Sequence, residues 1–206
     1  DLEIVVGEAK ICGHGAAQID DAVVVVGNLI ERFDHTAAAR VLALPDEVRA
    51  EVVRLMERFV AATPADSAAF RSAAADAYGE ALELEPKGGW LTDYERERLL
   101  EIDGRFLSHA WLRGPQRPDP KCSQVKVRAG VFVVSTEHER SRAVASVVGG
   151  RVERASVSDP ELNGTGAAVE ARLVGVAMAD VGSVLEGFGD PGRRLATAFA
   201  KARLVL

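Results

Sequence analysis

Cysteine is scarce in this chain of 206 residues: only Cys12 and Cys122 are present, and they lie far apart in the sequence. That number and spacing argue against a structural disulfide and favour a reducing compartment. No apolar run approaches the roughly 18–20 residues that a membrane-spanning helix needs, and no secretory apolar segment opens the chain. We therefore expect a cytoplasmic protein without a membrane span. Because the first residue is Asp1 rather than methionine, the sequence leaves open whether an N-terminal signal has been removed.

Aromatic residues and positive charge are also in short supply. Aromatic side chains make up 5% of the chain. The 31 Asp and Glu residues outnumber the 25 Lys and Arg residues, which gives a net charge of −6. A general nucleic-acid-binding protein needs a basic stripe, and stacking on bases needs aromatic side chains. The composition therefore argues against a nucleic-acid partner. Hydrophobic residues account for 48%, enough for one substantial core or two small ones.

The first 34 residues carry the pattern that is most informative about function. Residues 3–6 are a short β-branched run, Gly7 and Glu8 indicate a turn, and Lys10 begins a second short strand, so a tight hairpin is predicted. Gly13, Gly15 and two alanines then predict a loop. With almost no side chains, its backbone can adopt positive φ and let a ligand approach the amides closely.

Residues 22–26 form a continuous apolar run, which is typical of a strand buried on both faces, and the run ends at Gly27 and Asn28. A cation at Lys10, an amide-rich turn and a glycine at the end of a buried strand suit an anionic ligand such as a phosphate. The same pattern fits a turn that binds nothing and a lysine that is simply solvated. The residues alone leave both interpretations open.

Apolar spacing predicts three helices farther along the chain, over residues 46–60, 67–84 and 93–102. Pro45 suits the first position of the first helix, and Thr92 with Glu95 is a capping-box signature for the third. The second helix presents one apolar side, formed by Phe70, Ala74, Tyr78 and Leu82. Met56, Phe59 and Tyr78 are interpreted as core residues rather than as a cofactor stripe.

Three prolines among polar residues indicate an interdomain linker over residues 114–120. Valines then alternate around an expected bulge at Ala129 and Gly130, and Gly149 with Gly150 signals a hairpin with a primed turn. Residues 159–168 are predicted to be a turn-rich loop. Helices are expected over residues 169–174, 178–188 and 191–204, covering a three-stranded sheet. The four histidines, His14, His35, His109 and His138, lack the spacing of a metal site.

The order of residues in the first 34 positions resembles the lipoate-protein ligase family. Asp1 and Leu2 are similar to the end of an Asn-Asp-Ile/Leu segment, and residues 10–18 to a Lys-Ile/Val-Ser-Gly-Ser-Ala-Gln type loop. Residues 26–34 are similar to a strand that ends in His-Gly-Thr and is followed by an apolar pair and an aspartate. The resemblance continues through Pro45 and the pair at 110–111 into a compact tail, and so covers most of the chain.

The chain also departs from the family's pattern. Val25 and Val26 stand where many relatives have two histidines, Asn28 replaces a threonine, and His14 and Gly15 lengthen the loop after Lys10. The arginine- and glycine-rich motif that lies upstream in the family and lines the lipoyl pocket is not in this chain. Because the first residue falls inside a recognisable motif, we expect the C-terminal part of a longer ligase, or one half of a cut or two-chain enzyme.

The resemblance implies an α+β fold. Residues 1–113 would be the C-terminal part of a biotin/lipoate-ligase-like catalytic domain with a partial mixed sheet and helices, and residues 121–206 a small α+β accessory domain. It implies an ATP-dependent lipoate-protein ligase that activates lipoate as lipoyl-adenylate and transfers it to a lysine of a lipoyl-acceptor domain, of the 2-oxoacid dehydrogenase or glycine cleavage type. The missing N-terminal half of the catalytic domain would be a further partner.

In that scheme Lys10 is the catalytic residue, because its ammonium would bridge the carbonyl and phosphate oxygens of the adenylate. Asp1 would hold Mg²⁺ or orient the nucleotide, while Gly13, Gly27 and Asn28 would let ATP approach the backbone. Magnesium would be bound largely through phosphate oxygens.

Two other functions stay open at this point. One is an accessory protein that binds lipoyl domains without turnover. The other is an octanoyl or lipoyl transferase in which the Cys12 thiolate accepts the acyl group, although a buried cysteine is commonly just a small hydrophobic residue.

Overall fold

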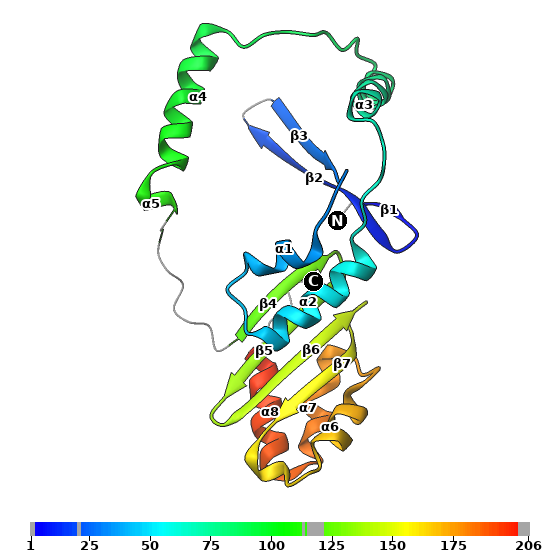
Figure 1. Ribbon diagram of the computed structural model, residues 1–206, viewed down its shortest axis with the longest axis vertical. Coiled ribbons are helices and arrows are strands. Elements are labelled where there is room, and N and C mark those ends of the chain that lie inside the picture. Colours follow the sequence, from blue (N-terminus) through cyan, green and yellow to red (C-terminus); the bar gives the residue numbers. More distant parts are fainter. Residues whose placement is uncertain (1–2, 20–21, 113, 115–121, 202–206) are drawn as a thin grey trace. The chain divides into compact units, whose positions relative to one another are not determined.

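The computed structural model describes residues 3–19, 22–112, 114 and 122–201 (Figure 1). Over these residues the fold is α+β, as predicted, with two antiparallel sheets of three and four strands and eight α-helices. The chain divides into two compact units, residues 1–64 with 121–206, and residues 65–120. These units do not follow the sequence-based division into 1–113 and 121–206, which stays a prediction. The linker expected over 114–120 lies, except for Gly114, outside the described residues.

The first sheet is formed by β1 (Ile4–Val6), β2 (Ala9–Ile19) and β3 (Ala22–Leu29), in that order. The tight hairpin is confirmed, since β1 pairs with the start of β2 and Gly7 has a φ of 59° in the turn. The loop predicted at Gly13 and Gly15 is wrong. Pairing with β3 continues without a break from Cys12 to the end of β2, so both glycines have ordinary strand conformations rather than positive φ.

The burial expected for residues 22–26 is also wrong. The exposed fractions of Val23, Val24, Val25 and Val26 are 70%, 41%, 46% and 62%. β3 is an edge strand whose one partner strand in the described part of the chain is β2. A long apolar run is typical of a strand covered on both faces, but the described residues leave valines on both faces of this strand exposed.

Two helices follow the first sheet, α1 (His35–Arg40) and α2 (Asp46–Phe59). The Asp34 carboxylate accepts the Ala37 N–H at 2.8 Å and caps α1. The predicted second helix is confirmed, although Pro45 is its N-cap rather than its first residue. Its fully buried side chains recur at helical spacing: Val48, Val52, Leu55 and Phe59. They pack against the second sheet, on valines of β5 and β6.

The second sheet has four strands in chain order: β4 (Cys122–Arg128), β5 (Val131–His138), β6 (Ser141–Val148) and β7 (Arg151–Ser158). The prediction of three strands is wrong because Ala129 and Gly130 form a turn instead of a bulge. Gly130 has a φ of 71° there, and the irregular pairing lies earlier, between Lys126 and Arg128. The hairpin at Gly149 and Gly150 is confirmed, with φ values of 58° and 76° as a primed turn requires.

Helices cover the face of this sheet opposite to α2 (Figure 1). They are α6 (Gly166–Leu173), α7 (Val181–Glu186) and α8 (Gly189–Lys201). Their buried side chains, such as Leu173, Leu185 and Leu195, form one core with Ala143 and Ala145 of β6. The predicted loop at 159–168 contains a 3₁₀ turn at Pro160–Leu162, and residues 202–204 of the last predicted helix lie outside the described residues.

The second unit contains α3 (Ser67–Leu82), α4 (Asp93–Phe106) and α5 (His109–Leu112). The capping box is confirmed, because the Thr92 hydroxyl accepts the Glu95 N–H and the Glu95 carboxylate accepts the Thr92 N–H. None of the described residues in these helices is buried. The core role predicted for Tyr78 is wrong, since 51% of it is exposed: a helix without a closely packed partner keeps its apolar side in solvent. None of the described helices is both long and apolar enough to cross a membrane.

Candidate functional site

Lys10 lies on β2 near the turn that joins it to β1, opposite Val5. The chain beyond α2 fixes its backbone from the other side, because the Ala61 N–H donates to the Lys10 carbonyl at 3.0 Å and Val60 forms a parallel bridge with Lys10. The Lys10 ammonium donates to Glu3 Oε1, also at 3.0 Å. Both the backbone and the charged end of the predicted catalytic lysine are therefore held in place.

Gly13 and Asn28 face each other across β2 and β3. The Asn28 side-chain carbonyl accepts the Gly13 N–H at 3.1 Å. A Cβ added at Gly13 would lie 3.0 Å from Asn28 Oδ1 and 3.3 and 3.4 Å from Cε and Nζ of Lys10. The missing side chain of Gly13 thus lets an ammonium and a carboxamide lie over the same stretch of backbone.

A shallow depression of about 310 Å³ opens beside this group. It is lined by Gly13, His14, Gly15, Val26, Gly27 and Asn28. Gly27 lies opposite His14, whose side chain is exposed. Four of the predicted site residues, Lys10, Gly13, Gly27 and Asn28, are therefore brought together on neighbouring parts of two strands. The fifth, Asp1, lies outside the described residues.

Glu3 is the residue of this site that the sequence did not reveal. Its side chain is only 10% exposed, and besides Lys10 it receives the Ala129 N–H at 3.1 Å. Burial alone would raise the pKa of the Glu3 carboxyl. The hydrogen bonds from Lys10 and Ala129, with the charges of Lys10 and Arg128, outweigh burial and hold that pKa below its ordinary value. A carboxylate directly before an apolar strand that pairs with the strand of Lys10 is the signal that could have identified it.

Cys12 is packed as a small hydrophobic residue. Only 3% of its surface is exposed, and its thiol lies 3.6 Å from the carbonyl of Gly13. A nucleophilic cysteine needs access to its acyl donor and a nearby group that favours the thiolate. This burial argues against the interpretation of Cys12 as an acyl acceptor.

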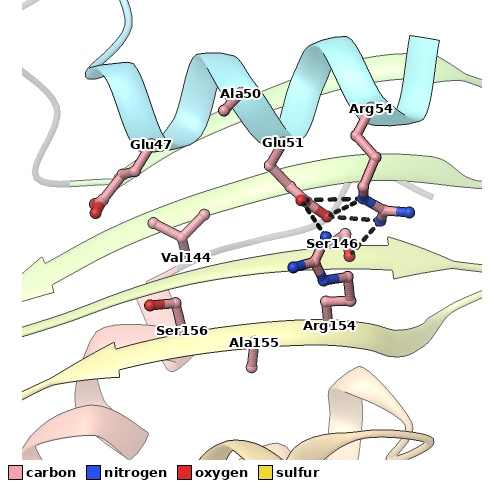
Figure 2. A pocket seen from close by; sticks show the side chains of 9 residues that line it. All are labelled: Glu47, Ala50, Glu51, Arg54, Val144, Ser146, Arg154, Ala155 and Ser156. Carbon is pink, nitrogen blue, oxygen red and sulfur yellow. Dashed lines mark hydrogen bonds and ion pairs between the residues drawn. The ribbon is translucent and has the colours of Figure 1, made fainter. Parts of the chain in front are cut away.

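A larger cavity, of about 340 Å³, lies between α2 and the strands β6 and β7 (Figure 2). Figure 2 shows Glu51 and Arg54 pointing from the helix toward Ser146 and Arg154 on the strands. Arg54 donates to Glu51 at 2.6 Å and to Glu153 at 2.7 Å, and Arg154 lies 3.4 Å from Glu51. Burial would raise the pKa of Glu51, but hydrogen bonds with Arg54 and Ser146 lower it overall.

The remaining charged residue of this cavity, Glu47, pairs with Arg142 at 2.7 Å. Each charged side chain that lines the cavity therefore already has an ion-pair partner within the chain. The arrangement connects α2 to the edge of the sheet and offers no uncompensated charge to a ligand. Of these ion pairs, the sequence alone indicates only the one between Glu51 and Arg54, because these residues lie three positions apart on one helix face.

No three His, Cys, Asp or Glu side chains in the described ranges come close enough to hold a metal ion. The predicted Mg²⁺ ligand, Asp1, is not among the described residues. What β2 and β3 do offer is an ammonium that is already paired with Glu3 and a carboxamide whose oxygen already accepts the Gly13 N–H. The remaining N–H groups of Lys10 and Asn28 are donors that suit a phosphate or a carboxylate. A scan against models of known protein families gives no match, and a search of curated proteins finds no relative of this chain.

Proposed function

We propose that this chain supplies the C-terminal part of an ATP-dependent lipoate-protein ligase, which forms lipoyl-adenylate and transfers the lipoyl group to a lysine of an acceptor domain. The observation that carries the proposal is the meeting of Lys10, Gly13 and Asn28 over one stretch of strand backbone. The family resemblance selects these residues from the sequence alone. Strand pairing by itself does not require an ammonium and a carboxamide beside the same glycine.

The two steps of the reaction place negative charge where the Lys10 ammonium can stabilise it. In the first step a lipoate carboxylate oxygen attacks the α-phosphorus of ATP and pyrophosphate leaves. In the second step the acceptor amine attacks the acyl carbonyl, loses a proton, and AMP leaves with the bridging oxygen. An ammonium fixed beside both the carbonyl and the phosphate oxygens favours the charge that develops on them. Gly13 leaves room for the adenylate to approach that ammonium.

The exposed strand β3 supports a further part of the proposal, that another segment completes the site. Its four valines, at positions 23–26, are between 41% and 70% exposed, and the edge of the strand has no described partner besides β2. An apolar edge strand of this kind is a ready template for pairing with another chain. We propose that the N-terminal half of the catalytic domain, which carries the arginine- and glycine-rich motif, pairs with β3 and covers these valines. We also propose a cytoplasmic location, which the scarcity of cysteine supports.

The test measures the intact mass of a lipoyl-acceptor domain after incubation with this chain, ATP, Mg²⁺ and lipoate, with and without the upstream half. The proposal expects a gain of one lipoyl group only when both parts are present. Lys10→Ala should abolish most of that gain, while Lys87→Ala, which removes an exposed lysine in the other compact unit, should not. Acceptor binding without any mass gain would instead support the accessory protein. A mass gain that needs no ATP, starts from an acyl-carrier donor and disappears in Cys12→Ala would support the transferase.

A further inference from the structure

Glu3 joins two sheets that lie far apart in the sequence. Its Oε1 atom accepts two hydrogen bonds, from the Lys10 ammonium at 3.0 Å and from the Ala129 N–H at 3.1 Å. Ala129 is 126 residues away and belongs to the turn between β4 and β5. The other oxygen, Oε2, faces the Arg128 guanidinium at 3.9 Å. One carboxylate therefore contacts both the predicted catalytic lysine and the second sheet.

We infer that Glu3 is a positioning residue through which the β4–β5 turn of the second sheet fixes the Lys10 ammonium. The inference deepens the proposed function and depends on it for its catalytic meaning. Its physical content is that the backbone N–H of Ala129 controls Lys10 through Glu3, and all three groups belong to this chain. It can therefore be tested whether or not lipoyl transfer is observed.

The burial of this contact distinguishes it from an ordinary surface ion pair. The Glu3 side chain is 10% exposed and that of Lys10 25%. Water screens such a pair less than it screens two exposed charges, so the carboxylate restricts the many rotamers that a free lysine would sample. Without Glu3, the ammonium could leave its place over Gly13, which lies directly under the lysine side chain.

The turn that holds Glu3 is itself anchored in the core. The Arg128 guanidinium lies 5.0 Å from the ring centroid of Phe59, a fully buried residue at the end of α2. The Gly130 carbonyl accepts the Gly149 N–H at 2.9 Å and connects this turn to the turn between β6 and β7. The Ala129 N–H is thus presented to Glu3 from a fixed backbone, so a change there should reach Lys10.

Ala129 offers a substitution that removes this donor. Gly130 has the positive φ of the turn, at 71°, whereas Ala129 does not. A positive φ at Gly130, with the irregular pairing between Lys126 and Arg128, fits a type I turn that ends in a glycine bulge as well as a type II turn, and only the type II turn favours proline at the position of Ala129. Because proline has no backbone N–H, Ala129→Pro deletes the donor that Glu3 accepts, and circular dichroism decides whether the turn tolerates it. Ala129→Ser keeps the N–H and is the matched control.

The experiment compares the acetylation of Lys10 with that of Lys87 in the same sample of the full chain, using limiting acetic anhydride and peptide mass spectrometry. Lys87 is the internal standard because its side chain is 79% exposed. We expect Glu3→Gln and Ala129→Pro each to raise the Lys10-to-Lys87 ratio about threefold or more, the factor expected when one modest polar contact is lost. Ala129→Ser should keep the wild-type ratio. Circular dichroism verifies that each variant is folded.

The double variant identifies the route of the effect. If Glu3 carries it, Ala129→Pro should add nothing to the ratio in the Glu3→Gln background. The inference is overturned by a wild-type ratio in folded Ala129→Pro, or by the same increase in both backgrounds. If Ala129→Pro does not fold, Arg128→Gln takes its place in the same cycle, and full additivity with Glu3→Gln overturns the inference. Failure of lipoyl transfer would contradict the proposed function and leave these ratios unchanged.

Discussion

The guanidinium of Arg194 on α8 holds the carboxylate of Asp159 in two parallel hydrogen bonds, at 2.9 Å from Nε to Oδ2 and 2.8 Å from Nη2 to Oδ1. The Asp159 side chain has no exposed surface. It also accepts the Glu161 N–H at 2.8 Å and the hydroxyl of Ser141, at the start of β6. This pair therefore fastens α8 to the end of β7 and the beginning of β6.

Arg194→Met should lower the free energy of unfolding by about 3 kcal/mol, because it leaves a buried carboxylate without its cation. The neighbouring Arg193→Met is the control, since Arg193 pairs with Asp190 at the surface, where both side chains are more than 60% exposed. Urea unfolding followed by circular dichroism measures both variants. Equal losses in the two would show that the Asp159 pair has no special importance.

Acid should weaken the fold through the same carboxylate. Burial alone would raise the pKa of Asp159, but hydrogen bonds from Ser141, Glu161 and Arg194 and the charge of Arg194 lower it below its ordinary value. A pKa that is lower in the folded state gives stability that is complete above the unfolded-state value, about 3.9, and is lost as the pH falls below it. Asp159→Asn should flatten the decline in urea midpoint below about pH 4. Parallel curves for the variant and the wild type would contradict this.

Gly13→Ala should disturb the candidate site, and Gly104→Ala, in α4, should not. A Cβ at Gly13 meets Asn28 Oδ1 at 3.0 Å and Lys10 Nζ at 3.4 Å, whereas a Cβ at Gly104 meets nothing within 4 Å. Neither glycine has positive φ, so backbone strain does not separate the two variants. In the two-part assay we expect Gly13→Ala to lower the rate of lipoyl transfer by roughly tenfold or more, as displaced catalytic groups commonly do. An equal rate for both variants would remove Gly13 and its neighbours from the site.

Cys12→Ala should leave ATP-dependent lipoyl transfer within about twofold of the wild-type rate, because a side chain that only fills space can be shortened without touching the reacting groups. Lys10→Ala should lower the same rate by a factor on the order of a hundred or more, the loss typical of removing one electrostatic contact to developing charge. Initial rates measured from intact acceptor mass compare the two. A large loss in Cys12→Ala with normal folding would transfer the catalytic role to the thiol.

The sequence predicted best where the decisive contacts are local. The turn at Gly7, the helix after Pro45 and the capping box at Thr92 each involve residues within a few positions of one another. The family resemblance selects Lys10 and Asn28, and the pairing of the consecutive strands β2 and β3 places Asn28 opposite Gly13, beside the Lys10 side chain.

The incorrect predictions share a physical cause. Gly13 and Gly15 have weak intrinsic preferences, and pairing with β3 decides that they lie in a strand rather than a loop. The contact between Glu3 and Ala129 links residues 126 positions apart and leaves no trace in local spacing. The apolar run at 22–26 was interpreted as buried because such runs usually are, but burial depends on what packs over the strand.

The exposed valines of β3 lead to a last prediction, about assembly. Val25→Lys should barely change the stability of this chain, by no more than about 0.5 kcal/mol, because the side chain is already 46% exposed. It should nevertheless weaken association with the upstream half by roughly tenfold or more, since a lysine on an edge strand opposes pairing and would be buried without a partner. Val41→Lys, at a position 83% exposed beyond α1, is the control and should bind normally. Titration calorimetry measures both. If Val25→Lys bound the upstream half as tightly as Val41→Lys does, β3 would not be the strand that the other half covers.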